Sequence, residues 1–193
     1  MKVKGLGLYG FAIMLASCGV RIKKDFIITE VSSERRPAWV KKMMYEPKGS
    51  EYKFFVSEAE NVDRRLCDKS AGSRGAVLIS SEIASRIDNT YQEVAESKNL
   101  EKESFSNEKL QQTIKSYLAG IEKHDSYWEK RSYQKKLGSE QDVVKYTCFN
   151  LLKMKKTTYD RAVELSVNRM FKEIETENKN EIRQEVRDKL LQE

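Results

Sequence analysis

The chain has 193 residues, with 36 lysines and arginines against 30 aspartates and glutamates, and a formal net charge of +6. The basic residues are scattered among acidic ones and form no concentrated basic face, which argues against a nucleic-acid-binding protein. A single histidine excludes a metal site built from several histidines, and two prolines with nine glycines argue against a loop-rich or fibrous chain. The length fits one domain with a modest core and appendages.

The N-terminus has the three-part layout of a secretory signal. Lys2 and Lys4 give a short positive start, and residues 5–15 are uncharged and mostly apolar. This apolar stretch is too short to span a bilayer as a permanent helix. It closes on a tetrapeptide that resembles the bacterial lipobox and consists of Leu15, Ala16, Ser17 and Cys18. The sequence therefore predicts a lipoprotein signal peptide over residues 1–17.

Cys18 is the predicted lipidation site, because its thiol can take a diacylglycerol through a thioether before cleavage and later N-acylation. Several acyl chains hold a protein at a membrane almost permanently, whereas a single chain binds marginally. Gly19 stands where an aspartate would favour the inner membrane in enteric-type sorting, so we expect an outer-membrane protein whose domain faces the periplasm. The alternative interpretation is an ordinary signal peptide with a cysteine near its end. No cofactor other than the covalent lipid is expected.

The first half of the mature chain predicts a tether followed by a strand and a helix. Residues 18–36 are polar and charged apart from residues 26–28, and are expected to act as a tether or a loosely docked arm that carries the domain clear of the lipid surface. The folded part is expected to open at Pro37, with Trp39 as a core anchor, and residues 52–56 form an aromatic and β-branched run typical of a strand.

A helix is predicted over residues 65–83, because small and apolar side chains recur there at helical spacing, namely Leu66, Cys67, Ala71, Gly75, Leu78, Ile79 and Ile83. Residues 87–93 either continue this helix or alternate as a strand.

The second half predicts a helix and two strands. Residues 106–123 carry one apolar helical face made of Leu110, Ile114, Tyr117, Leu118 and Ile121. Residues 127–133 alternate as a strand, and Gly138 marks a turn. The strongest strand signal covers residues 143–154, where one face holds Val144, Tyr146, Cys148, Leu152 and Met154.

The C-terminal part predicts a long helix and a polar helical tail. Thr157 and Thr158 are expected to cap a helix that runs to Ile174. Its apolar stripe consists of Tyr159, Ala162, Val163, Ser166, Val167, Met170, Phe171 and Ile174. Residues 175–193 are predicted to form the tail, whose thin stripe of Ile182, Val186 and Leu190 could dock elsewhere.

This order of elements predicts an α+β fold, a two-layer sandwich whose domain covers residues 37–174. Several segments resemble the small outer-membrane lipoproteins typified by the twenty-kilodalton Lpp antigen: residues 37–40, the strand ending at 55–59, the small-residue helix over 76–84, and residues 127–130 and 146–154. The resemblance implies a helix packed across an antiparallel sheet of about four strands, one of them formed by residues 85–95. This sequence departs from the family at Gly72 and Gly75, where alanines and arginines are usual.

The residues with possible chemistry favour structural roles. Cys67 and Cys148 fall on the predicted helix and central strand, so a disulfide could join the two layers; buried free thiols are the alternative. His124 is expected at an exposed turn. Residues 72–75 lack the Lys-Ser/Thr of a phosphate-binding loop, and their small side chains are expected to let a helix approach a sheet. The aromatic residues fit a core better than a sugar platform; they are Trp39, Phe54, Phe55, Tyr127, Trp128 and Tyr146.

We therefore expect a non-catalytic protein with no metal site and no small-molecule substrate. By resemblance, it would be a structural or assembly component of the cell envelope; one branch of the family builds the disc around the flagellar motor. Exposed sheet edges and the apolar stripe of the tail would supply contacts for self-association or for protein partners. The alternative is a monomeric periplasmic adaptor or regulator that binds an envelope-biogenesis or export partner.

Overall fold

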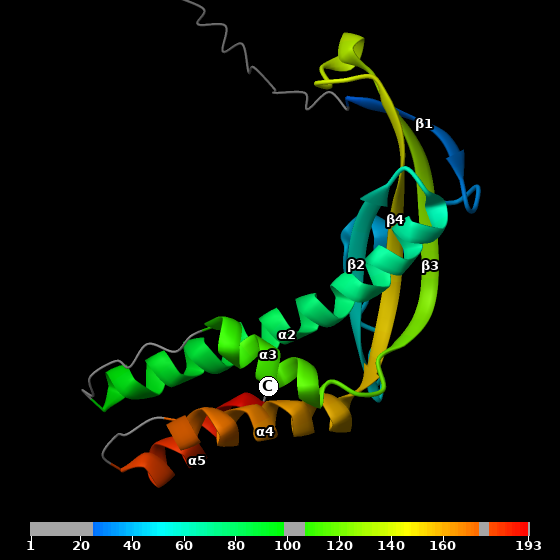
Figure 1. Cartoon of the computed structure of the whole chain (residues 1–193). Helices are drawn as coiled ribbons and strands as arrows, with labels where there is room; N and C mark the ends of the chain where they lie inside the picture. Colours follow the sequence, from blue (N-terminus) through cyan, green and yellow to red (C-terminus); the bar gives the residue numbers. More distant parts are fainter. Residues whose placement is uncertain (1–24, 99–106, 174–177, 193) are drawn as a thin grey trace, which may run out of the picture.

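The computed structural model describes residues 25–98, 107–173 and 178–192, so the predicted signal peptide and Cys18 lie outside the described residues. Within these ranges the chain forms one antiparallel sheet of four strands, in the order β1-β3-β4-β2 (Figure 1). The strands are β1 (Phe26–Val31), β2 (Tyr52–Asn61), β3 (Glu122–Tyr133) and β4 (Val143–Lys155). The predicted α+β class and the antiparallel sheet are confirmed.

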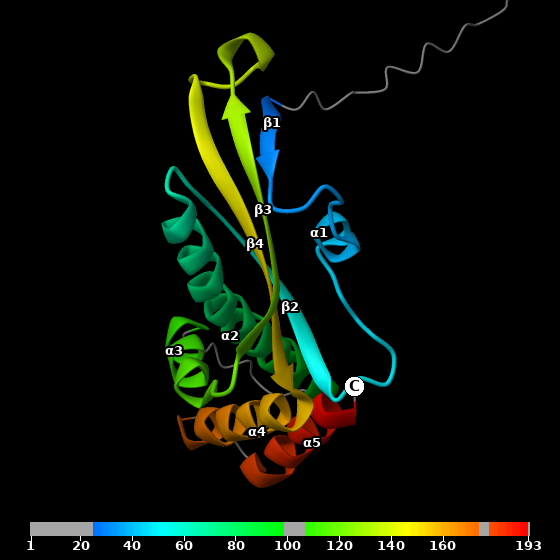
Figure 2. The ribbon, with the colours of Figure 1, turned by 90° about the vertical axis from the view of Figure 1, so that its right-hand side faces the viewer.

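The helices are distributed unequally around the sheet. They are α1 (Ala38–Lys42), α2 (Arg64–Ser97), α3 (Asn107–Tyr117), α4 (Lys156–Glu173) and α5 (Lys179–Gln192). The 34 residues of α2 make it about 50 Å long, so it crosses one face of the sheet and continues beyond it. The second half of α2, from Ile79 onward, is surrounded by α3, α4 and α5, and we call this group the helical lobe (Figures 1 and 2).

The start and the path of α2 follow from its side chains. The Asp63 side chain accepts a hydrogen bond from the backbone nitrogen of Leu66 at 2.9 Å and thereby caps the helix. A Cβ atom at Gly75 would overlap Leu152 Cδ1, so a side chain at this position would force Leu152 to move or the helix to lie farther from the sheet. The expectation for the small residues of this segment is therefore confirmed at Gly75.

The strand implied by the resemblance for residues 85–95 is wrong. Buried side chains recur every three or four positions through the second half of α2, at Ile79, Ile83, Ile87, Tyr91 and Val94. This spacing keeps one helical face on the lobe, so the helix continues to Ser97. The helical alternative for residues 87–93 is the correct one.

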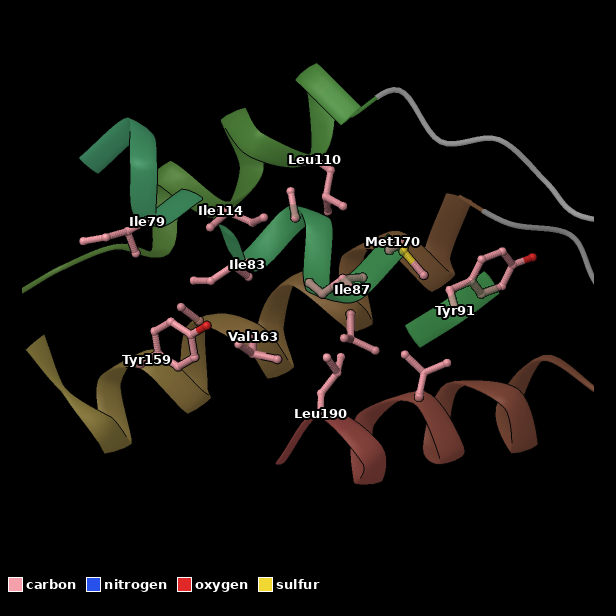
Figure 3. Close-up of a cluster of buried hydrophobic side chains, with 14 of the residues drawn as sticks. Ile79, Ile83, Ile87, Tyr91, Leu110, Ile114, Tyr159, Val163, Met170 and Leu190 are labelled. Atoms are coloured by element: carbon pink, nitrogen blue, oxygen red, sulfur yellow. The ribbon is translucent and has the colours of Figure 1, made fainter. Parts of the chain in front are cut away.

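The largest hydrophobic core lies in the helical lobe (Figure 3). Side chains from all four of its helices meet there, among them Ile83, Ile87, Leu110, Ile114, Tyr159, Val163, Met170, Ile182, Val186 and Leu190. The apolar stripe of α5 is thus part of this core. The stripe docks on the chain's own helices, so the tail cannot offer these three residues to a partner.

The tether prediction is wrong for residues 26–31, which form β1 and pair with β3. Phe26 lies opposite Tyr133 and Val31 opposite Glu129, so the folded part begins before Pro37. The branched residues Ile27 and Ile28 favour an extended backbone. The side of β3 that faces away from β4 has backbone groups available, and residues 26–31 pair with them.

Three element boundaries also differ from the prediction. The helix predicted over residues 106–123 ends at Tyr117, and β3 begins at Glu122 after Gly120 with φ 72°. β2 continues past Val56 to Asn61, because it stays paired with β4 along its whole length. α4 begins at Lys156, directly after β4, so Thr157 and Thr158 lie inside its first turn rather than before it.

Candidate functional site

The outer side of β1 is the best candidate for a functional surface. β1 stands at the end of the strand order, and no strand in the described part of the chain pairs with this side. Ile27, Ile28 and Val31 are 47%, 38% and 38% exposed. Unpaired backbone groups beside exposed branched side chains form a template for another strand. We call this surface, residues 27–31 with their outer backbone, the β1 edge.

A bulge divides the β1 edge. The pairing register with β3 shifts between Ile28 and Glu30, and the Thr29 hydroxyl donates a hydrogen bond to the Lys130 carbonyl oxygen at 3.2 Å. Bulges shorten the regular part of an edge strand and re-aim its side chains. A partner strand would therefore pair with a short segment on one side of Thr29.

A buried charge network fixes the segment that follows β1. Glu129 of β3 is fully buried, and its Oε2 accepts hydrogen bonds from Arg131 Nη2 at 2.7 Å and Nε at 2.9 Å. Its other oxygen lies 3.1 Å from Nε of Arg36, which comes after β1 in the sequence. Because Glu129 is withdrawn from water, the ion pair with the partly exposed Arg36 helps to hold the segment against the sheet.

Two further carboxylates lie beside this network. Glu60 Oε1 accepts hydrogen bonds from the Tyr133 hydroxyl at 2.5 Å and the Thr147 hydroxyl at 3.1 Å, and lies 3.7 Å from Arg131 Nη1. Burial raises the pKa of Glu58, and Glu60 adds to this effect while Arg131 opposes it. The carboxylates of Glu58, Glu60 and Glu129 thus share the Arg131 cation, and their contacts join β2, β3 and β4.

Aromatic contacts hold the first residue of β1. The Phe26 ring lies 5.3 Å from the Tyr133 ring, and the Arg131 guanidinium carbon lies 4.4 Å from the Phe26 ring centroid. A cation over an aromatic face at this distance is attracted to it. Gln134 N donates a hydrogen bond to the Asp25 carbonyl oxygen at 3.1 Å, so the chain enters the fold beside the β3–β4 hairpin.

A disulfide joins Cys67 to Cys148, with the Cα atoms 5.7 Å apart. This separation lies within the usual range for a disulfide. Both cysteines are buried with Ala59 and Ala71, whose small side chains let the start of α2 lie close to β2 and β4. The bridge therefore connects the helix layer to the centre of the sheet.

His124 is exposed, as predicted, but it lies in β3 and not at a turn, because β3 begins at Glu122. Its ring lies 5.3 Å from the Phe54 ring and 6.2 Å from the Tyr45 ring. The six aromatic candidates are divided among three separate core clusters and form no single exposed surface in the described part of the chain. Trp39, Phe55 and Tyr127 are buried, whereas Phe54, Trp128 and Tyr146 are partly buried against the cores.

Sequence reasoning missed the charge network. The alternation of residues 127–133 puts Glu129 and Arg131 on the same face of a strand as Tyr127 but indicates no role for them, and the sequence assigns Arg36 to the tether. The available signal was a glutamate and an arginine two residues apart in an alternating strand, since such a pair projects from one face of a sheet.

Within the described ranges, no group of three or more His, Cys, Asp or Glu side chains could hold a metal ion. No helix in the same ranges is both long enough and apolar enough to cross a membrane. Comparisons with protein-family models and with curated proteins find no match for this chain.

Proposed function

We propose that this protein is a lipoprotein attached to the outer membrane through Cys18, with its folded domain in the periplasm. In this proposal it is a non-catalytic structural or assembly component of the cell envelope that associates with further copies of itself or with other proteins in a multimeric complex. The Leu15-to-Cys18 motif supports the anchor. The β1 edge, with its three exposed apolar side chains, is the observation that carries the assembly role.

The arrangement of the fold agrees with an anchored assembly protein. β1 begins beside the β3–β4 hairpin, whereas the helical lobe lies at the opposite end of the sheet (Figures 1 and 2). A tether that precedes Asp25 would place the hairpin towards the membrane. The β1 edge would then stand between the lipid surface and the lobe, within reach of neighbouring anchored copies.

Light scattering of residues 19–193 over a range of concentrations tests the assembly role. A discrete assembly is expected, and Ile27→Lys should dissociate it because a charge on an edge strand opposes strand pairing. Leu165→Lys is the control, because Leu165 is an apolar residue 37% exposed on helix α4 and lies on no strand, whereas Ile27 is 47% exposed on the edge strand β1. A monomer at every concentration would contradict self-association.

The anchor has its own test. Wild-type protein expressed with labelled palmitate should carry the label and enter the detergent phase, whereas Cys18→Ser should do neither. Ser17→Ala keeps the thiol and serves as the control. Acylated, membrane-bound Cys18→Ser protein would contradict the anchor without bearing on the β1 edge.

The alternative function, a monomeric periplasmic adaptor, is favoured by the outer face of α2. Val77 and Leu78 are 46% and 42% exposed there, and Arg74, Ser81 and Glu82 border them. A mixed apolar and charged patch of this kind fits a transient protein contact. A monomer in light scattering that captures a defined partner, and loses it in Leu78→Lys, would support the adaptor.

A further inference from the structure

A cavity of about 400 Å³ lies where the sheet meets the helical lobe. It is lined by residues 45–47, by residues 52–55 at the start of β2, by Glu82 of α2 and by Lys156 of α4. Figure 2 shows β2 beginning beside α4 and α5, and the Lys156 backbone nitrogen donates a hydrogen bond to the Glu51 carbonyl oxygen at 2.9 Å. The cavity is remote from the β1 edge and has the size of a small-ligand site.

Lys53 supplies a cation that has no anionic partner. Its ammonium nitrogen lies 4.0 Å from the centroid of the Tyr159 ring, and in the described part of the chain no carboxylate lies within ion-pairing distance of it. The side chain is partly buried, and this burial lowers the pKa of Lys53; Arg86 adds to this effect, whereas the carboxylates of Glu82 and Asp160 oppose it. A cation that is partly withdrawn from water and unpaired gains from a bound anion.

Two carboxylates, Glu46 and Glu82, line the cavity, and Glu82 already has a partner. Glu82 Oε1 lies 3.4 Å from the Tyr159 hydroxyl, which also accepts a hydrogen bond from Arg86 Nη1 at 3.1 Å. Tyr159 is almost fully buried, so this group is fixed behind Lys53. Lys156 adds a second cation at the cavity wall. Lys53 therefore forms no ion pair with a carboxylate of the described residues, and an anion in the cavity would provide one.

Aromatic rings form the remaining wall. Tyr45 contacts Phe54 edge to face with ring centroids 4.9 Å apart, and Phe55 stacks on Tyr159 at 6.1 Å. Tyr52 also faces the cavity and is partly buried. Such rings favour a flat, apolar body rather than a bare inorganic ion.

We propose that this cavity binds a small organic anion, a carboxylate or phosphate group carried on a flat apolar body. Lys53 is the counter-ion, Lys156 adds positive charge at the wall, and the rings of Tyr45 and Tyr52 contact the body of the ligand. This site is independent of the lipid anchor and of the β1 edge.

NMR spectra of lysine side chains in the full chain, kept in a neutral detergent, test the proposal. The probes are benzoate, phenyl phosphate and, as the neutral control, benzyl alcohol. The Lys53 signal should shift saturably with one or both anions and not with the alcohol, and the two anions distinguish a carboxylate from a phosphate site. Bound anion should also raise the pKa of Lys53, because it stabilises the charged ammonium.

Lys53→Met should weaken binding of the preferred anion by about tenfold or more, as expected for loss of a charged partner. Lys155→Met is the matched control, because Lys155 is a neighbouring but exposed lysine, and it should leave binding within about twofold. The wild-type titration stands even if Lys53→Met fails to fold. A Lys53 signal that responds equally to sodium chloride, or an unchanged pKa with either anion, would overturn the proposal.

Discussion

The two ends of the described chain each carry a short apolar stripe in a polar surrounding, yet the fold uses them in opposite ways. In α5, Ile182 and Val186 are fully buried, whereas in β1, Ile27 and Ile28 are 47% and 38% exposed. Both segments were expected to lie outside the main domain. The comparison shows that an apolar stripe indicates where contact will occur, but only the surrounding elements decide whether that contact lies within the chain.

The largest expected effect on stability comes from a charge in the buried stripe of α5. Val186→Asp places a charge in the lobe core and should lower the free energy of unfolding by at least about 4 kcal/mol. Ile27→Asp in β1 should change it by less than about 1 kcal/mol, because the side chain is already half exposed. Urea denaturation of both variants measures the difference. Equal effects would mean that β1 is as tightly packed as α5.

Removal of the disulfide would show whether the sheet and the helical lobe differ in stability. The bridge spans 81 residues and joins α2 to the sheet, so its loss should cost about 4 kcal/mol by loop entropy. Amide hydrogen exchange of Cys67→Ala/Cys148→Ala should show lost protection in β2 and β4 and retained protection in the lobe. Uniform loss across both regions would show that they unfold as one unit.

The close approach at Gly75 predicts a smaller effect. Gly75→Leu forces a side chain against Leu152 and should lower the free energy of unfolding by about 1–3 kcal/mol. Gly72→Ala is the control, because the nearest atom to a Cβ there is Asn150 Nδ2 at an ordinary 3.7 Å, and alanine favours a helix by about 1 kcal/mol. Thermal unfolding of the pair should therefore move in opposite directions.

The smallest effect concerns pH and the charge network near β1. The pKa of Glu58 is raised in the folded state, so between the ordinary and the raised value the folded protein binds more protons than the unfolded protein. This contribution to stability is present at low pH and is lost as the pH rises through the folded-state pKa. Glu58→Gln should remove the loss and stabilise the protein at pH 7 by less than about 1 kcal/mol. Urea midpoints across pH 4 to 8, with Glu140→Gln as control, would detect it.

The sequence alone predicts an element correctly where its pattern of apolar residues is compatible with only one kind of secondary structure. The spacing of Tyr159, Val163, Met170 and Phe171 predicts α4, and the alternation around Tyr146 predicts β4, because a helical stripe or a long strand that is buried on one face tolerates few alternatives. Gly138 has φ 109°, which explains why a glycine stands at the β3–β4 turn.

The remaining features depend on contacts that are distant in sequence. β1 exists because β3 offers an open side about a hundred residues later, and the Arg36–Glu129 pair forms only once both segments are in place. The Lys53 cavity needs residues from β2, α2 and α4 together. None of these arrangements leaves a local periodicity, so single-sequence reasoning had no signal for them beyond the charged pair in β3.

The place where β1 enters the fold determines how the molecule would bear mechanical load. In an anchored protein, a pull between the membrane and the lobe enters the fold at Asp25 and runs along β1, which extends from the hairpin towards the helices (Figure 1). Antiparallel hydrogen bonds lie perpendicular to the strands, so this force loads the β1–β3 pairs in shear, all at once, rather than peeling them apart singly. The Arg36–Glu129 pair lies at the far end of the same line and resists the same displacement.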